Sequence, residues 1–209
     1  MDLFFFDFDK TLYAYDSRKR LPALSIASGV SQYHIAKTWW QGGFEIRAES
    51  GEWPTAVEYL AEFERITGAA ITLEQWQQAR ALASTRIAGS IDALRRAASI
   101  GTACVLSNNP SVFAESLPVL APDVVAIVGD NRLVSCELGV RKPDPQVFEL
   151  ALGRFNARPK DTFFVDDSAA NVAGAASVGI HTHHLVYLNG VPQVDGLHAA
   201  IERFAARKK

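Results

Sequence analysis

Acidic side chains directly follow a very apolar segment at the start of the chain. In the sequence MDLFFFDFDKT, Asp7 and Asp9 stand one residue apart after the run Leu3–Phe6, and Thr11 follows. Ionised carboxylates at the end of a buried segment are costly unless a cation or hydrogen-bond donors complete the site. These residues therefore predict a chemical role for this end of the segment.

Three further polar stretches end or follow predicted apolar strands. LSNN contains Ser107 and Asn108, RKPDP contains Lys142, and FFVDDS contains Asp166 and Asp167. In open parallel sheets the ligand site lies outside the carboxyl ends of the strands. We therefore expect all four stretches to meet in one crevice.

Such a crevice requires a cation. Carboxylates ~4 Å apart repel by about 1 kcal/mol per pair in water and by about 4 kcal/mol at an effective dielectric of 20. Hard carboxylate oxygens, with no His or Cys at ligand spacing, suit Mg²⁺, which commonly binds through one or two carboxylates plus a substrate phosphate. Lys142 adds positive charge, and Ser107 and Asn108 offer neutral donors. This combination suits a phosphoryl group.

The apolar patterning predicts the elements that position these stretches. Short apolar runs predict buried, mostly parallel strands. Their alternation with helices from about residue 88 onward predicts an α/β fold with a sheet covered on both faces. The predicted strands are Leu3–Phe8, Thr102–Leu106, Val124–Val128, Thr162–Val165 and Ile180–Tyr187. The predicted N-caps of the intervening helices are Ser90, Asp144, Ser168 and Asp195.

Residues 14–86 contain no convincing strand and carry helix signals instead. Ser31 can start a helix that runs through Trp40, and Pro54 precedes the helical pattern TAVEYLAEFERIT. Thr72 and Gln75 form a capping-box pattern. These signals predict a helical insertion placed just after the first strand.

The four polar stretches resemble, in order, the motifs of the haloacid dehalogenase (HAD) superfamily. DFDKTL resembles the first motif, DxDx[TV]; LSNN resembles the second, RKPDP the third, and FVDDSAANV the fourth, an acidic pair after a strand. The resemblance covers residues 1–13 and 88–209. It implies a Rossmann-like, doubly wound core domain there, and it implies that residues 14–87 form an inserted helical cap domain of the C1 type.

The resemblance also implies an activity, namely Mg²⁺-dependent hydrolysis of a small phosphomonoester through an aspartyl-phosphate. Asp7 would be the nucleophile, and Asp9 would serve as general acid and then as general base. Ser107 and Lys142 would hold the phosphoryl oxygens. The dehalogenases of the superfamily lack the second Asp, so Asp9 predicts phosphoryl transfer rather than carbon–halogen cleavage.

Metal and substrate contacts follow from the same resemblance. Asp7, the backbone carbonyl of Asp9, and Asp167 would bind Mg²⁺ directly, and Asp166 would act through a metal-bound water. The fourth motif can also be aligned one residue off, which would exchange the last two roles. The predicted substrate-binding residues are Thr11, Asn108 and, in the insertion, Arg47.

Other features of the sequence leave alternatives open. Arg47 and Glu49 lie in FEIRAESGEW and are candidate specificity residues. The basic run Arg18–Arg20 is either solvated, which we favour, or steers an anionic substrate. The aromatic side chains near Trp39 form either the core of the insertion or a wall over the substrate. The HTHH stretch, residues 181–184, is conceivable as a metal site, but the end of a core strand is the favoured interpretation.

The class of substrate and the reaction also leave alternatives. A sugar phosphate or a nucleoside monophosphate is the expected substrate. A phosphomutase of the β-phosphoglucomutase kind would use the same four motifs. A non-catalytic binding protein that retains the fold is the third interpretation, although Asp7, Asp9 and Lys142 are all present.

Composition restricts the remaining possibilities. The chain has 209 residues, of which 48% are hydrophobic and 21% charged, as in ordinary soluble domains. The net charge of -2 gives no general attraction to nucleic acid. Cys104 and Cys136 form no CxxC pair and predict buried thiols in a reducing compartment. With no signal-peptide or membrane-span pattern, we expect a cytoplasmic monomer or homodimer without nucleic-acid or membrane partners.

Overall fold

A parallel five-stranded sheet forms the centre of the computed structural model, which describes residues 1–208. β1 (Leu3–Phe6) lies in the middle, between β4 (Thr102–Ser107) and β6 (Thr162–Asp166). β5 (Arg132–Val134) and β7 (His181–His184) are the edge strands, so the order is β5-β4-β1-β6-β7. Because all strands run in the same direction, their carboxyl ends share one edge of the sheet.

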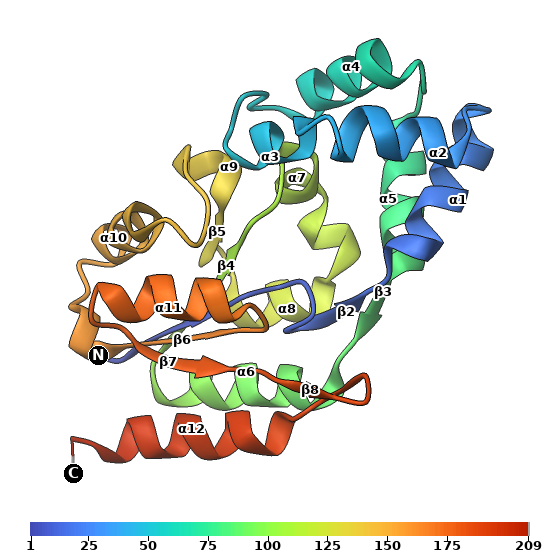
Figure 1. Cartoon of the computed structure of the whole chain (residues 1–209). Helices are drawn as coiled ribbons and strands as arrows, with labels where there is room; N and C mark the ends of the chain where they lie inside the picture. Colours follow the sequence, from blue (N-terminus) through green and yellow to red (C-terminus); the bar gives the residue numbers. More distant parts are fainter. Residues whose placement is uncertain (209) are drawn as a thin grey trace.

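Helices cover both faces of this sheet (Figure 1). On one face, Phe4 and Phe6 of β1 pack with side chains of α6 (Ala88–Ile100) and α12 (Val194–Ala206). On the other face, Leu3 and Phe5 pack with side chains of α10 (Pro145–Arg154) and α11 (Ala169–Ser177). Burial on both faces explains the uninterrupted apolar sequence of β1. The other elements of this part are α7 (Ser111–Leu120), α8 (Pro122–Val128), α9 (Ser135–Leu138), the 3-10 helix η2 (Pro159–Asp161), β8 (Tyr187–Leu188) and β9 (Val191–Pro192).

A set of helices, called the helical insertion below, is enclosed by an antiparallel ribbon of two short strands. β2 (Tyr13–Tyr15) leads into the insertion and β3 (Ser84–Arg86) leads out of it. Figure 1 shows the insertion beyond the edge of the sheet where the strands end. Its elements are α1 (Ser17–Ser28), α2 (Gln32–Ile35), the π-helix η1 (Ala36–Trp40), α3 (Phe44–Glu49), α4 (Ala56–Thr67) and α5 (Leu73–Ala83).

The insertion has an aromatic core of its own. Trp39 is fully buried and its ring contacts those of Phe44, Trp53 and Tyr59 at centroid distances of 5.2–5.7 Å. The aromatic cluster near Trp39 is therefore packing within the insertion, as one of the two interpretations predicted. Trp40, one residue later, faces a cavity instead.

Most predicted elements are confirmed, with shifted ends. Four of the five predicted strands contain β1, β4, β6 and β7 or coincide closely with them. The side chains of Asp144 and Ser168 cap α10 and α11 as expected. The capping box of Thr72 and Gln75 begins α5, and Ser31 caps a helix that continues as a π-helix to Trp40. Both cysteines are buried free thiols.

The prediction of a strand at Val124–Val128 is wrong, because these residues lie in α8. Pro122 occupies the first turn of the helix and Asp123 follows it, and both favour a helix start. Val124 and Val128 are the buried residues, with the four-residue spacing of a helix face. The strand that pairs with β4 is instead β5, which has three residues and begins with Arg132.

Several other predictions also need correction. Residues 14–86 do contain strand, since β2 and β3 form the short ribbon. Ser90 and Asp195 lie inside helices that begin at Ala88 and Val194. The basic run lies in α1, and its last residue, Arg20, is buried rather than solvated.

Within residues 1–208, no single helix is long and apolar enough to cross a membrane. The helices α7 and α8 reach that length and composition only as a pair, and they meet at a bend of 95°.

Candidate active site

The first polar stretch forms a tight turn at the end of β1. The backbone of Asp7 still pairs with the neighbouring strand, since its N–H donates to Val165 O at 3.0 Å. The chain then reverses at Lys10, which has a φ of 60° and donates its N–H to Tyr13 O at 2.6 Å. This turn leaves the Asp7 side chain buried and the Asp9 side chain partly exposed.

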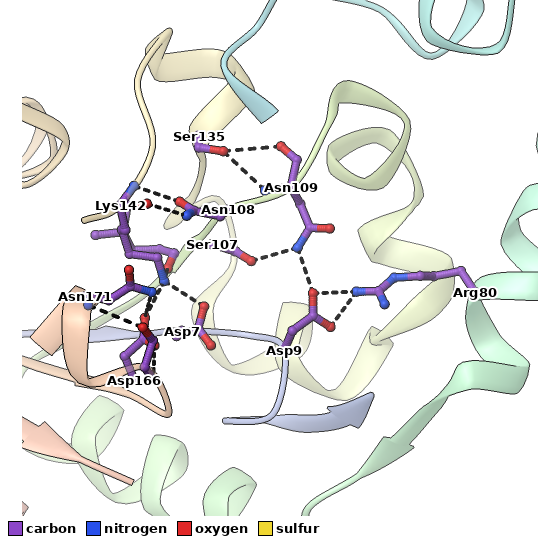
Figure 2. A network of polar contacts seen from close by, with 12 residues as sticks. Asp7, Asp9, Arg80, Ser107, Asn108, Asn109, Ser135, Lys142, Asp166 and Asn171 are labelled. Carbon is purple, nitrogen blue, oxygen red and sulfur yellow. Dashed lines mark hydrogen bonds and ion pairs between the residues drawn. The ribbon is translucent and has the colours of Figure 1, made fainter. Parts of the chain in front are cut away.

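Lys142 links two of the predicted acids in the interior (Figure 2). Its ammonium group donates to Asp7 Oδ1 at 2.6 Å, to Asp166 Oδ2 at 2.7 Å and to Leu106 O at 2.8 Å. Only 1% of the lysine is exposed, so these three bonds account for its three donors. Burial alone would lower the pKa of Lys142, but the charges of Asp7 and Asp166 outweigh it and raise the pKa. The lysine is therefore held as a cation.

The fourth stretch places its two acids differently. Asp166 is fully buried at the end of β6, where its carboxylate also accepts from Ser168 N at 2.8 Å and Asn171 Nδ2 at 2.9 Å. Asp167 is the next residue and is partly exposed. One oxygen each of Asp7, Asp166 and Asp167 lies within 4.8 Å of the others. This acidic trio is a candidate cation site.

Electrostatics at the trio favour a bound cation. Burial, and then the charge of Asp166, raise the pKa of Asp7 well above its usual range. The same two causes, in the same order, raise the pKa of Asp167. Three carboxylates face one ammonium group, so full ionisation leaves two negative charges for a divalent cation to neutralise.

The second stretch supplies the neutral donors. Asn109 Nδ2 donates to Ser107 Oγ at 2.9 Å and to Asp9 Oδ2 at 3.0 Å. Asn108 makes a reciprocal pair with the backbone of Lys142: its Nδ2 donates to Lys142 O at 2.8 Å and its Oδ1 accepts from Lys142 N at 2.9 Å. The β4 stretch thus positions both Lys142 and Asp9.

Asp9 also contacts the helical insertion. Arg80 of α5 donates from Nη2 to Asp9 Oδ1 at 2.5 Å and to Oδ2 at 2.7 Å (Figure 2). The two acids of the first stretch therefore lie in separate ion pairs, Asp7 with Lys142 and Asp9 with Arg80.

A cavity of about 270 Å³ lies between Asp9 and the insertion. Its polar lining has both donors and acceptors, and Trp40 adds an aromatic surface. The lining residues are Asp9, Tyr15, Arg20, Trp40, Glu45, Ile46, Glu49, Arg80, Asn108 and Asn109.

The structure brings together most of the predicted site residues, from the ends of β1, β4 and β6 and from the loop after α9, which carries Lys142. The residues that meet are Asp7, Asp9, Ser107, Asn108, Lys142, Asp166 and Asp167. Thr11 lies apart from the cavity lining, and its buried Oγ1 has no hydrogen-bond partner within residues 1–208. Arg47 is exposed and pairs with Glu52, whereas Glu49 lines the cavity.

Three polar contacts were not anticipated from the sequence. Asn109 and Asn171 lie inside the stretches LSNN and FVDDSAANV, so their place in those motifs was an available signal. Arg80 stands 71 positions from Asp9 and gave no signal.

The histidine stretch makes packing and backbone contacts with neighbouring protein groups. His181 packs against the ring of Phe204 at 5.2 Å, and His184 Nε2 lies 2.9 Å from Asp167 O. Across the described part of the chain, the acidic trio is the one group of three or more His, Cys, Asp or Glu side chains suited to a metal.

Comparisons with known proteins identify the family. The model of the haloacid dehalogenase-like hydrolases matches residues 1–179. A HAD family enzyme from Bacteroides thetaiotaomicron, solved with magnesium and inorganic phosphate, is 21% identical with a TM-score of 0.73, over 88% of this chain and 93% of that one. A predicted HAD-like family hydrolase from Porphyromonas gingivalis is 20% identical with a TM-score of 0.74, over 99% of this chain and 98% of that one. These likenesses show the shared α/β fold.

Curated relatives match only over short segments. Mouse acyl-CoA dehydrogenase family member 10 is 45% identical over 53 residues, which are 25% of this chain and 5% of that protein. Rat bifunctional epoxide hydrolase 2 is 29% identical over 83 residues, 39% of this chain and 15% of that protein. (S)-2-haloacid dehalogenase 1 of Pseudomonas sp. (strain CBS-3) is 34% identical over 53 residues, which are 25% of this chain and 23% of that protein. The chain thus spans less than a quarter of each relative.

Proposed function

Because the chain belongs to the haloacid dehalogenase-like hydrolase family, we propose that it is a Mg²⁺-dependent phosphatase that hydrolyses a small phosphomonoester through an aspartyl-phosphate. The observation that carries this proposal is the separation of Asp7 and Asp9 into two ion pairs on one loop. Asp7 lies among Lys142 and the other acids, where a phosphoryl group would be bound. Asp9 lies at the cavity, where a leaving group would be bound.

The acidic trio fits Mg²⁺. Its donors are all carboxylate oxygens, and the net charge that Lys142 leaves uncompensated is that of a divalent ion. In this proposal, Asp7, Asp167 and the Asp9 carbonyl hold the ion. Asp166 is already bonded to Lys142, Ser168 N and Asn171, so it supports the site indirectly. The ion would neutralise charge on the phosphoryl oxygens.

The chain's own residues then divide the reaction into two displacements. In the first, a carboxylate oxygen of Asp7 bonds to phosphorus while the bond to the leaving oxygen breaks, and that oxygen takes the proton of Asp9. Lys142 engages Asp7 through Oδ1, and within residues 1–208 Oδ2 accepts no hydrogen bond, so Oδ2 is the available nucleophile.

In the second displacement, water attacks the phosphoryl group. Asp9, now ionised, takes a proton from the water while the bond between phosphorus and Asp7 breaks, and inorganic phosphate leaves. Ser107 would hold a phosphoryl oxygen in both steps, and Lys142, whose three donors are taken by Asp7, Asp166 and Leu106 O, would stabilise the phosphoryl charge electrostatically. The ion pair with Arg80 and the bond from Asn109 suit the ionised form of Asp9 that this second step requires.

The helical insertion would act as a cap over the leaving group. It contacts the core through Ser111 Oγ, which donates to Trp53 O at 2.7 Å, and through Ser135 Oγ, which donates to Glu49 O at 2.6 Å. Such closure excludes bulk water during the reaction. The mixed donors and acceptors of the cavity suit the leaving group of a sugar phosphate or a nucleoside monophosphate.

A panel of phosphoesters and 2-haloacids with Mg²⁺ tests the proposal. We expect release of inorganic phosphate from at least one phosphomonoester and no halide from haloacids, because Asp9 supplies a leaving-group acid that cleavage of a carbon–halogen bond does not need. Asp7→Asn should abolish turnover. Asp130→Asn, at an exposed surface acid, should leave turnover unchanged.

Other outcomes would replace the proposal. Conversion of a sugar phosphate into its isomer without free phosphate would identify a mutase. Halide release would identify a dehalogenase, the activity named for one curated relative. Absence of all activity across the panel would favour a binding protein.

A further inference from the structure

Arg80 is the charged side chain through which the insertion contacts the candidate catalytic loop. Only 2% of the residue is exposed, and its guanidinium carbon lies 4.3 Å from the ring centre of Tyr15 and 5.2 Å from that of Phe113. Its Nη2 donates to both oxygens of Asp9 (Figure 2). A buried, planar guanidinium held between two rings has little freedom, so it fixes the carboxylate that it binds.

The two connections between the core and the insertion meet at this ion pair. Arg80 lies one turn before β3, and Ser84 Oγ of that strand donates to Arg80 O at 2.9 Å. Tyr15, whose ring covers the guanidinium, pairs with Ser84 in the ribbon. Asp9 itself forms a backbone bridge with Tyr13 at the start of β2. Asp9, the ribbon and α5 are therefore one connected unit.

We propose that Arg80 is a positioning residue for proton transfer, one that ties the Asp9 carboxyl group to the placement of the helical insertion. This inference rests on the proposed function. Asp9 lies on the exposed side of its turn, and Asn109 is its one other side-chain partner within the described chain. Without Arg80, the carboxyl group keeps one weaker tether and can turn away from the leaving oxygen. Misplacement of a reacting group by about 1 Å can cost on the order of 10²-fold in rate.

Arg80 has an alternative role that must be distinguished, because it also lines the cavity. It could bind the leaving group or the phosphoryl group directly. In that case its loss would weaken catalysis whatever the leaving group is, and would do so independently of Asp9. If Arg80 acts through Asp9, its loss matters only where the leaving oxygen needs a proton.

The experiment compares kcat/KM for two substrates, an alkyl phosphate such as glycerol phosphate and p-nitrophenyl phosphate. The parameter kcat/KM reports the first displacement, and p-nitrophenolate departs without protonation. The main variant is Arg80→Met, which keeps apolar packing against the two rings. For Arg80→Met we expect a loss of about 10²-fold on the alkyl phosphate and of less than about threefold on the aryl phosphate.

A double-mutant cycle completes the test. In an Asp9→Asn background, Arg80→Met should change kcat/KM for the alkyl phosphate by less than about threefold, since two residues that act as one unit are not additive. Arg80→Lys, which keeps the charge and one donor, should recover part of the loss. Arg86→Ala is the matched control: this arginine lies in the same ribbon, and its Nε donates to Asp123 rather than to the site.

The outcomes distinguish a failure of the proposed Arg80 role from a failure of the proposed phosphatase function. Equal losses on both substrates, or an additive loss in the Asp9→Asn background, would overturn the role of Arg80 while leaving the phosphatase proposal intact. A wild-type protein that hydrolyses neither substrate nor any other phosphomonoester would instead overturn the proposed function. If Arg80→Met does not fold, Arg80→Lys and Arg80→Gln provide the same comparison of leaving groups.

Discussion

The carboxyl group of Glu49 should make the stability of the protein depend on pH. Glu49 ends α3 and lines the cavity, with Oε2 at 2.8 Å from Arg141 Nε. This ion pair lacks hydrogen-bond geometry, so the two atoms attract each other without a directed bond. Burial, and then the charge of Glu45, raise the pKa of Glu49 to about 7 against the opposing effect of Arg141.

The direction of this pH dependence follows from the pKa of Glu49 in the folded and the unfolded chain. In the unfolded chain the pKa of Glu49 is near 4.5, so at intermediate pH the folded protein holds a proton that the unfolded chain has released. The stabilisation is fully present below about pH 4.5 and is lost as pH rises through about 7. At 1.36 kcal/mol per pKa unit, the rise in the pKa of Glu49 from 4.5 to about 7 corresponds to about 3 kcal/mol in the free energy of unfolding. About 2–3 kcal/mol of this stabilisation is lost between pH 5 and pH 8.

The substitution Glu49→Gln removes this titration with little change in shape. Urea unfolding of both proteins, measured with EDTA between pH 5 and pH 8, gives the free energy of unfolding at each pH. We expect the stability of the variant relative to the wild type to rise by about 2–3 kcal/mol across that range. A difference that stays constant with pH would refute the reasoning. Glu52→Gln is the control: Arg47 lowers the pKa of Glu52, so that residue does not titrate in this range.

Three further predictions concern the site and its support. Lys142→Met should lower the free energy of unfolding by about 3 kcal/mol in urea with EDTA, because two buried carboxylates lose their cation. Lys160→Met, at an exposed lysine, should leave that free energy unchanged. Tyr59→Phe should destabilise by about 1–2 kcal/mol in thermal unfolding, because it deletes the buried bond from Tyr59 Oη to Glu45 at 2.8 Å. EDTA should abolish release of phosphate and added Mg²⁺ should restore it; full activity in EDTA would contradict a divalent-cation requirement.

The chemistry at the strand ends could be anticipated because it depends on local sequence. β1, β4 and β6 are short apolar runs, and each is followed at once by the polar stretch that it positions. The rule that parallel strands end at one edge then brings those stretches together without knowledge of packing. The failure at α8 did not disturb the predicted site, because Lys142, the next site residue along the chain, reaches Asp7 and Asp166 from the loop after α9 rather than from a strand end.

Contacts supplied by the insertion could not be anticipated. Arg80 reaches Asp9 only because α5 packs beside α1 and the ribbon brings the two ends of the insertion together. Arg47 and Glu49 were both candidate specificity residues in the sequence, and Arg47 was the one predicted to bind substrate, yet residues two positions apart lie about 200° apart around a helix. The structure turns Glu49 to the cavity and Arg47 to the surface, where it pairs with Glu52.

The two ion pairs of the first motif imply a division of labour between the parts of the chain. Lys142 and Asp166 both belong to the core, so the position of Asp7 is set without the insertion. Asp9 is two residues away, yet its charged partner belongs to the insertion. Phosphoryl binding should therefore depend on the core alone, whereas proton transfer to the leaving group should depend on how the insertion is docked. Substrates that hold the insertion in place would have a higher kcat as well as a lower KM, because binding energy far from phosphorus would be used to position Asp9.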